Sequence, residues 1–278
     1  MRYLPSAIGV FTVLPAPLID LDRQVARRLI LRFPLVGAVL GLIAAVFALA
    51  LGWYSHNGSL GAAVGLAVLA VCTGAMHLDG LADTADGFGS RRPAKEALDI
   101  MRRSDIGPMG VAALVLVLIL EWAALSGLSP SIMAAAFITG PVVGRAACVR
   151  ATGQWRPGAR QGGFGALFAQ VTSRRAAWWT LILTLLGVAV VGLFGIVAKQ
   201  FESRLHLVGT PGAFQEIWPE YTLVGVLWFV AAAVVAFLVG SVAAHRFQAR
   251  FGGLTGDTFG AIVELSTLAF WLALAGIL

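Results

Sequence analysis

Seven apolar stretches, each about as long as a bilayer is thick, constrain this chain more than any other feature. An α-helix needs about 20 predominantly apolar residues to cross the hydrocarbon core of a membrane. The stretches that meet this requirement are Leu35–Tyr54, Leu60–Leu78, Pro108–Leu128, Pro130–Val149, Ala176–Ala198, Thr222–Ala244 and Phe259–Leu278. We therefore predict one all-α domain, residues 1–278, which is a polytopic integral membrane bundle of about seven helices.

The basic residues predict which helix ends face the cytoplasm. Short cytoplasmic loops retain Lys and Arg, whereas short translocated loops lose them. All basic residues except Lys199 and Arg204 lie in or near the segments 1–34, 79–107, 150–175 and 245–258. We therefore predict that the N-terminus is inside. The net charge of +6 then reflects membrane orientation, and no nucleic-acid partner is expected.

Two further features concern packing at the start of the chain. The segment Leu4–Pro17 is apolar but short and contains three prolines, so whether it enters the membrane is left open. Gly37 and Gly41 form a small-xxx-small pair on the first span. Such pairs let two helix backbones approach closely, and we expect this one to serve packing alone.

Three aspartates follow the second span in the sequence His77-Leu-Asp-Gly-Leu-Ala-Asp-Thr-Ala-Asp-Gly. If the helix continues through this stretch, Asp79, Asp83 and Asp86 share one face within a spread of about 60°. Their mutual repulsion is relieved by a divalent cation, and hard oxygen ligands favour Mg²⁺ or Mn²⁺. We predict that the three aspartates are catalytic and bind such a metal for a phosphorylated substrate. The alternative is that they solvate a helix end or pair with nearby arginines.

A second acidic pair lies at the start of the last span. Asp257 and Glu264 are seven residues apart, so they share a helix face, and Glu264 lies about 10 Å further into the bilayer. A carboxylate at that depth needs a partner or a polar cavity, which favours a functional role for Glu264. Asp257 suits metal or substrate binding and, equally, a helix N-cap. Both join the predicted metal ligands.

Candidate substrate-binding residues surround these carboxylates. Arginine binds phosphate through two parallel hydrogen bonds, and helix N-termini favour anions. The residues we predict to bind substrate are His77, Arg102, Arg103, Ser104, Asp105, Arg145, Thr255, Asp257 and Thr258. The glycine-rich segment 159–165 is weaker evidence for phosphate binding. Glu121 falls toward the outer side under this topology and is excluded from the site.

Three motifs in this chain resemble those of the cobalamin-5'-phosphate synthase family, the adenosylcobinamide-GDP ribazoletransferases. They are the aspartate motif from His77, Met101-Arg-Arg-Ser-Asp-Ile-Gly, and Gly253-Leu-Thr-Gly-Asp-Thr-Phe-Gly-Ala-Ile-Val-Glu. Phe11-Thr-Val-Leu-Pro is also similar to the N-terminus of that family. The motifs occur in the family's order over nearly the full length. One departure is Gln161-Gly162, where related sequences tend to carry acidic residues, and it leaves the role of that loop open.

The resemblance implies a Mg²⁺-dependent transferase of a substituted phosphate group in late vitamin B12 biosynthesis. The 3'-hydroxyl of α-ribazole or of α-ribazole 5'-phosphate attacks the cobinamide-linked phosphorus of adenosylcobinamide-GDP, and GMP leaves. Asp79 and Asp83 are then the leading metal ligands. Asp86 completes the metal site or accepts the proton of the attacking hydroxyl.

The same resemblance implies a place and partners for the enzyme. We expect it in the cytoplasmic (inner) membrane of a bacterium or archaeon, within the lipid bilayer, with its site facing the cytoplasm. A homo-oligomer and association with other enzymes of the corrinoid pathway stay open. The alternative functions are another Mg²⁺-dependent membrane phosphotransferase or prenyltransferase that acts on a diphosphate, and a transporter. A transporter places its essential carboxylates near the bilayer midplane, whereas these aspartates lie at one edge.

Reporter fusions test the predicted orientation. Fusions after residues 100 and 165 should report a cytoplasmic position, and a fusion after residue 210 an external one, because the basic loops stay inside. Paired alkaline phosphatase and fluorescent-protein fusions measure both states. The reverse pattern at the three positions would overturn the orientation.

Overall fold

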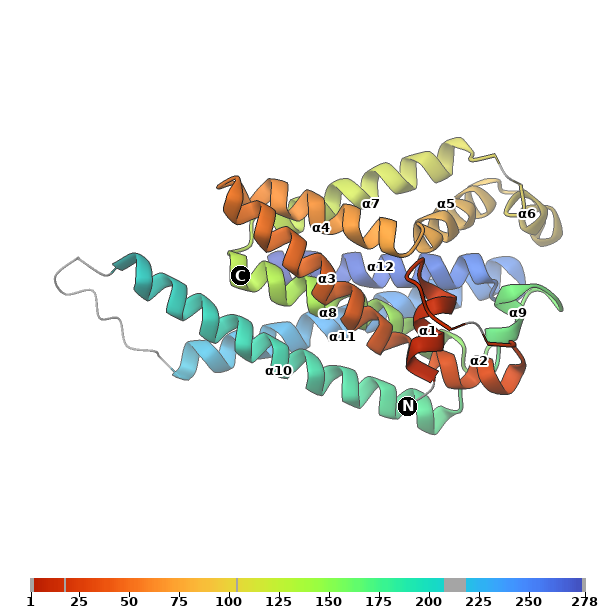
Figure 1. Cartoon of the computed structure of the whole chain (residues 1–278). Helices are drawn as coiled ribbons and strands as arrows, with labels where there is room; N and C mark the ends of the chain where they lie inside the picture. Colours follow the sequence, from red (N-terminus) through yellow and green to blue (C-terminus); the bar gives the residue numbers. More distant parts are fainter. Residues whose placement is uncertain (1–2, 18, 104, 208–218, 277–278) are drawn as a thin grey trace.

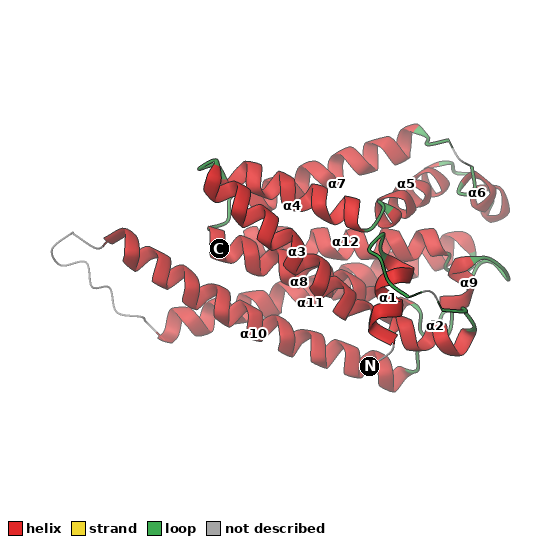
Figure 2. Ribbon diagram, in the orientation of Figure 1, coloured by secondary structure: helices red, strands yellow, loops and turns green. Residues whose placement is uncertain are grey.

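The computed structural model describes residues 3–17, 19–103, 105–207 and 219–276. These residues form α-helices joined by loops, and no strand occurs among them (Figure 2). The helices are α1 (Tyr3–Phe11), α2 (Arg23–Ile30), α3 (Phe33–Tyr54), α4 (Gly58–Cys72), α5 (Met76–Gly89), α6 (Ala94–Ile100), α7 (Pro108–Ser126), α8 (Pro130–Ala151), α9 (Phe164–Phe168), α10 (Arg174–Leu207), α11 (Pro219–Phe251) and α12 (Gly256–Ala275). The predicted all-α membrane bundle is confirmed.

Six helices in the described part of the chain are long and apolar enough to cross a membrane. They are α3, α7, α8, α10, α11 and α12. A seventh crossing results if α4 and α5 are counted as one bent span. The number of spans is therefore six, or seven with the bent pair, in agreement with the predicted count of about seven.

The second predicted span differs from the expectation in its shape. α4 ends at Cys72, and α5 starts at Met76 after a bend of 87°. Gly74 and Ala75 have φ angles of +59° and +56°, in the left-handed region that ends a right-handed helix. The expectation of one continuous helix from the span into the aspartates is therefore wrong. α5 itself is helical through Gly89, so the aspartates keep their helical spacing.

Helix α8 forms the centre of the bundle. Of its most apolar stretch, 83% is buried, a larger share than in the other candidate spans, and α3, α10, α11 and α12 pack against it. The backbones of α3 and α8 approach closely at the two glycines of the small-xxx-small pair. A Cβ atom on Gly37 would lie 2.5 Å from the carbonyl oxygen of Pro141, and one on Gly41 would collide with the carbonyl of Phe137. The predicted packing role of this pair is confirmed.

The shorter helices gather at one end of the bundle. Figure 1 shows α1, α2, α6 and α9 at the end opposite the turn between α3 and α4. The inner segments predicted from the basic residues contain these helices. α1, which overlaps the segment 4–17 whose place was left open, is a short helix that packs against α2 and α3. The bundle therefore has one end rich in arginine, next to which the candidate site is built.

Substituting Gly37 tests the close approach of α3 and α8. We expect Gly37→Ala to lower the free energy of unfolding by about 1–3 kcal/mol, because backbone atoms of α8 must move to admit the methyl group. The control is Gly187→Ala on α10, where an added Cβ meets nothing within 4 Å. Melting temperatures of the purified variants in detergent measure the difference. Equal melting temperatures for both variants would contradict the packing assigned to Gly37.

Candidate active site

The carboxylates of two helices meet because α5 and α12 pack with almost no side chain between them. A Cβ atom on Gly80 would lie 2.7 Å from the carbonyl oxygen of Asp257, and one on Gly260 would lie 3.2 Å from the Cα of His77. Only glycine allows helix backbones to come this close. The contact places Asp79 and Asp83 of α5 near Asp257 in the first turn of α12.

The charges at this contact are unbalanced. The carboxylates of Asp79, Asp86 and Asp257 all repel that of Asp83, and the guanidinium of Arg160 attracts it. Asp83 and Asp257 are partly buried, and Asp79 is exposed. Like charges held together in a partly dry environment favour binding of a cation or of a cationic group. The predicted gathering of Asp79 and Asp83 with Asp257 is thus present in the structure.

Asp86 has a structural role that its position in the sequence did not reveal. One carboxylate oxygen accepts a hydrogen bond from the backbone N–H of Gly107 at 2.7 Å, and the other accepts one from Gly110 at 2.8 Å. Asp86 therefore caps the first turn of α7 from a neighbouring helix, where a negative charge also interacts favourably with the helix dipole. Both oxygens are engaged, which distinguishes Asp86 from Asp79 and Asp83.

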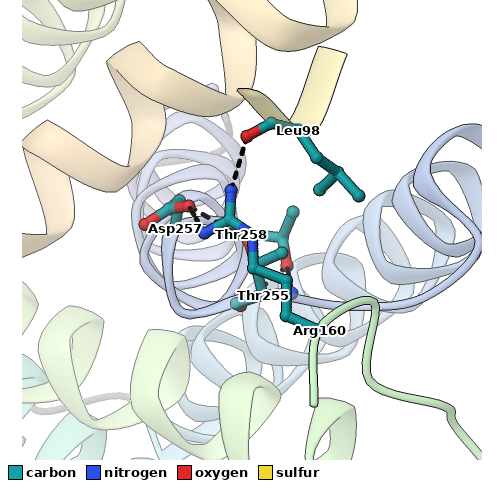
Figure 3. A network of polar contacts seen from close by, with 5 residues as sticks. All are labelled: Leu98, Arg160, Thr255, Asp257 and Thr258. Carbon is teal, nitrogen blue, oxygen red and sulfur yellow. Dashed lines mark hydrogen bonds and ion pairs between the residues drawn. The ribbon is translucent and has the colours of Figure 1, made fainter. Parts of the chain in front are cut away.

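The start of α12 is fixed by two threonines (Figure 3). The Oγ1 of Thr255 accepts a hydrogen bond from the backbone N–H of Thr258, and the Oγ1 of Thr258 accepts one from the N–H of Thr255. This reciprocal pair is a capping box. Thr255 is the N-cap, so a capping role for Asp257 is wrong. Both hydroxyls are used within the buried cap, which gives the two threonines a structural role; substrate binding by them stays a prediction.

Arg160 is the site residue that sequence reasoning underrated. Its Nη1 lies 3.4 Å from Oδ2 of Asp257, and its Nη2 donates a hydrogen bond to the carbonyl of Leu98 at 2.8 Å (Figure 3). The loop that carries it is held by hydrogen bonds between Ala159 and Leu254 and between Leu254 and Pro157. A single arginine in a glycine-rich loop has no periodic signal, so only the fold shows that it faces Asp257.

A cavity of about 240 Å³ opens beside these residues. It is bounded by α1, α5, the glycine-rich loop, α9 and the start of α12. Its polar lining consists of His77, Asp79, Arg160, Thr255 and Asp257, and its aromatic lining consists of Phe11, Phe33, Phe164, Phe168 and Phe259. The cavity thus combines carboxylates, a guanidinium and phenylalanine rings in its lining.

The described residues of the arginine-rich loop after α6 do not line this cavity. Arg102, Arg103 and Asp105 are exposed, and none of them lines the cavity. Ser104 lies outside the described residues. Arg102, Arg103 and Asp105 are therefore not brought to the cavity, which corrects their predicted convergence with the aspartates. The chain is fixed to α5 on both sides of them, by Met101 against Gly87 and by the Asp86 cap of Gly107 and Gly110, and the three side chains between these contacts are exposed.

A second, deeper cluster contains Glu264 and Arg145. The Nδ1 of His77 lies 4.0 Å from Oε1 of Glu264, and the charges of Arg145 and Glu264 attract each other. Glu121 is buried beside Glu264, and these four side chains line a small cavity of about 40 Å³.

Two expectations need correction here. Arg145 is not at the aspartate cavity, and Glu264 is not grouped with the aspartates. The physical reason is mutual compensation, because ionisable groups inside a membrane protein pair with one another. Glu121 lies outside the aspartate cavity, as expected.

The donor set at the α5–α12 contact is chemically suited to Mg²⁺. Carboxylate oxygens are the ligands this ion prefers. Within the described ranges, no three His, Cys, Asp or Glu side chains form a ready-made metal cage. Mg²⁺ commonly takes only one or two carboxylates and completes its coordination with water and phosphate oxygens. The residues therefore fit an ion that is bound together with a diphosphate, and the metal stays a prediction.

Comparisons with known proteins point to one family. The family model described as cobalamin-5-phosphate synthase matches residues 3–275. A protein of Desulforamulus reducens named adenosylcobinamide-GDP ribazoletransferase is 35% identical, over 98% of this chain and 96% of its own length. Proteins of the same name from Pseudomonas entomophila and Fusobacterium nucleatum are 36% and 29% identical, over 89% and 95% of this chain and 87% and 93% of their own lengths. No solved structure matches.

Replacing Asp86 separates its capping role from the role of Asp79. We expect Asp86→Ala to lower the free energy of unfolding by about 1–2 kcal/mol, because α7 loses the acceptor for two backbone N–H groups. Asp79→Ala is the matched control, since this carboxylate is exposed on the same helix and repels Asp83, so its removal should not lower stability. Thermal unfolding in detergent measures both. An unchanged melting temperature for Asp86→Ala would refute the cap.

Proposed function

This chain belongs to the cobalamin-5-phosphate synthase family, and from this premise we propose that it is an adenosylcobinamide-GDP ribazoletransferase. The observation that carries the proposal is the family match, which spans nearly the whole chain. The carboxylate-lined cavity supplies a site with the chemistry that the reaction needs. In this reaction an α-ribazole hydroxyl and adenosylcobinamide-GDP combine, and GMP is released.

The reaction replaces one phosphate ester by another. The 3'-hydroxyl oxygen of α-ribazole or of its 5'-phosphate bonds to the cobinamide-linked phosphorus, and the bond from that phosphorus to the bridging oxygen of GMP breaks. The hydroxyl loses its proton, which goes to one of the cavity carboxylates. The bridging electron pair leaves with GMP. Stabilising the charge that develops on the phosphate oxygens and on the leaving group is the main catalytic task.

We propose that Asp79 and Asp83, with Asp257 opposite them, hold Mg²⁺. When bound, the ion would neutralise the diphosphate oxygens and the leaving group. Asp86 is less suited to this role, because both of its oxygens already accept backbone hydrogen bonds. The three remaining carboxylates come from two helices whose backbones are fixed against each other at Gly80, so only side chains would have to move to bring their oxygens to one ion.

Arg160 would bind a phosphate of the substrate. Its distance of 3.4 Å to Asp257 exceeds the 2.7–2.9 Å of a strong charge-assisted hydrogen bond. The guanidinium therefore keeps donors free to turn toward a phosphate oxygen, while its bond to the Leu98 carbonyl holds the side chain at the cavity. Two planar N–H groups directed at one phosphate provide both charge and orientation.

We also propose that the site faces the cytoplasm. The cavity lies at the end of the bundle where α2 and α9 gather (Figure 1), and the segments at this end carry most of the basic residues. Lys and Arg in short loops mark the cytoplasmic side of a bacterial membrane protein. A cytoplasmic site would also have access to water-soluble nucleotides.

Release of GMP tests the function. The purified full-length protein should release GMP from adenosylcobinamide-GDP only when α-ribazole or its 5'-phosphate is present, and EDTA should stop the reaction until Mg²⁺ is restored. Asp83→Asn should lower the rate at least about 100-fold, comparable with the loss of one essential electrostatic group. Chromatographic detection of GMP measures each rate.

The control for Asp83→Asn is Asp99→Asn, an exposed aspartate on α6 that is not among the charged groups acting on Asp83 or Asp257. It should retain the native rate. No GMP release by the native protein with both substrates and Mg²⁺ would refute the proposed function. A folded Asp83→Asn protein with near-native turnover would remove this residue from the catalytic site.

A further inference from the structure

The aromatic side of the cavity has a role that the phosphate chemistry does not explain. Phe11 packs against Phe33 and Phe168, with ring centroids 4.3 and 5.4 Å apart. Phe164 packs against Phe168 at 5.0 Å. These four rings form one contiguous cluster, here called the phenylalanine wall, in the lining of the cavity that Asp79 also lines. Phosphate recognition requires no apolar surface, so a different part of a substrate is expected to contact it.

Phe164 is the ring of this wall that remains open. It is 45% exposed, whereas Phe11, Phe33 and Phe168 are almost fully buried behind it. Its position is fixed by its neighbours, because Gly165 packs directly against the backbone of Gly256 at the start of α12. The ring is thus an exposed aromatic face on a supported backbone, next to the groups that would bind the diphosphate.

We propose that the phenylalanine wall binds the flat base of the nucleoside acceptor, with the base stacked on Phe164 and its ribose directed toward the carboxylates. This inference rests on the proposed function. A base and an aromatic ring stack favourably whatever the sequence of the nucleic acid or nucleotide. Stacking at this point would leave the ribose hydroxyls of the acceptor near Asp79, where the attacking oxygen must lie.

The size of the cavity supports the nucleoside over the corrinoid. Its volume of about 240 Å³ is below the range of about 300–1,000 Å³ that accommodates drug-sized ligands. A corrinoid macrocycle is larger than such ligands and does not fit, so it must remain outside the cavity. A bicyclic base of the acceptor fits within this volume.

The two substrates carry different bases, guanine in adenosylcobinamide-GDP and the base of α-ribazole, and the chemistry of the wall distinguishes between them. Guanine carries N–H donors and a carbonyl oxygen. Burying these groups without hydrogen-bond partners costs free energy. The base of α-ribazole is a dimethylbenzimidazole, whose edge is largely apolar. The rings of the wall offer guanine no hydrogen-bond partner, and neither do the side chains of Ile30, Ala166 and Leu254, which line the same cavity. The wall therefore favours the base of the acceptor over that of GDP.

Steady-state kinetics of the full-length enzyme test this inference through Phe164. Phe164→Ala should raise KM for α-ribazole at least about five-fold, the lower end of the loss expected for one base stack. KM for adenosylcobinamide-GDP should not change, and Phe164→Trp should keep the native KM for α-ribazole because a ring remains. The control is Phe88→Ala, an aromatic ring of similar exposure (44%) on α5 that lies outside the cavity, and it should change neither KM.

A competition experiment with the native enzyme avoids dependence on folding of the variants. Free 5,6-dimethylbenzimidazole should inhibit GMP release competitively with α-ribazole, and guanine at the same concentration should not. An unchanged KM for α-ribazole in folded Phe164→Ala would overturn the inference. A rise confined to KM for adenosylcobinamide-GDP, or inhibition by guanine alone, would also overturn it and place guanine at the wall. Absence of GMP release by the native enzyme would instead reject the proposed function.

Discussion

The site depends on one close contact, that between the backbones of α5 and α12 at Gly80. At this point the carbonyl of Asp257 occupies the space that a side chain would fill, so the two helices carry their acidic residues to the same place. The bend of 87° between α4 and α5 gives α5 a direction different from that of α4, and in this direction α5 packs against α12. The capping box of Thr255 and Thr258 fixes the start of α12 at the same level. The packing of α5 against α12 thus holds the carboxylates together despite their mutual repulsion, and contacts in the rest of the bundle stabilise that packing.

The acidic residues are divided between two environments that meet at His77. This histidine lines both the large cavity with Asp79 and the small cavity with Glu264. In the large cavity the carboxylates are partly exposed and have one cationic neighbour, Arg160. In the small cavity the partly buried Glu264 and the buried Glu121 lie with Arg145, which compensates charge inside the membrane domain. The first arrangement suits binding of a charged ligand from water, and the second suits fixing helices to one another.

Sequence patterns predicted those features that depend on local chemistry. The lengths of the apolar stretches predicted the membrane spans. Gly37 and Gly41 indicated the close approach of α3 to α8, and the spacing of Asp79 and Asp83 indicated that they share a helix face. Two kinds of feature were missed. One is the bend before α5, which contains two left-handed residues; one of them is an alanine, Ala75, and alanine carries no signal for such a turn. The capping of α7 by Asp86 and the pairing of Arg160 with Asp257 join residues far apart in the sequence, so no local period reveals them.

The central claim is that carboxylates of α5 and α12 together bind one divalent ion with a diphosphate. An anomalous difference map from crystals of the full chain grown with Mn²⁺ and GDP tests it most directly, because the map locates the ion independently of any activity. The account predicts a peak in coordination distance of a carboxylate oxygen of Asp79 or Asp83, on the side that faces Asp257. A peak at Glu264, or at saturating Mn²⁺ no peak near the two aspartates of α5, would contradict it.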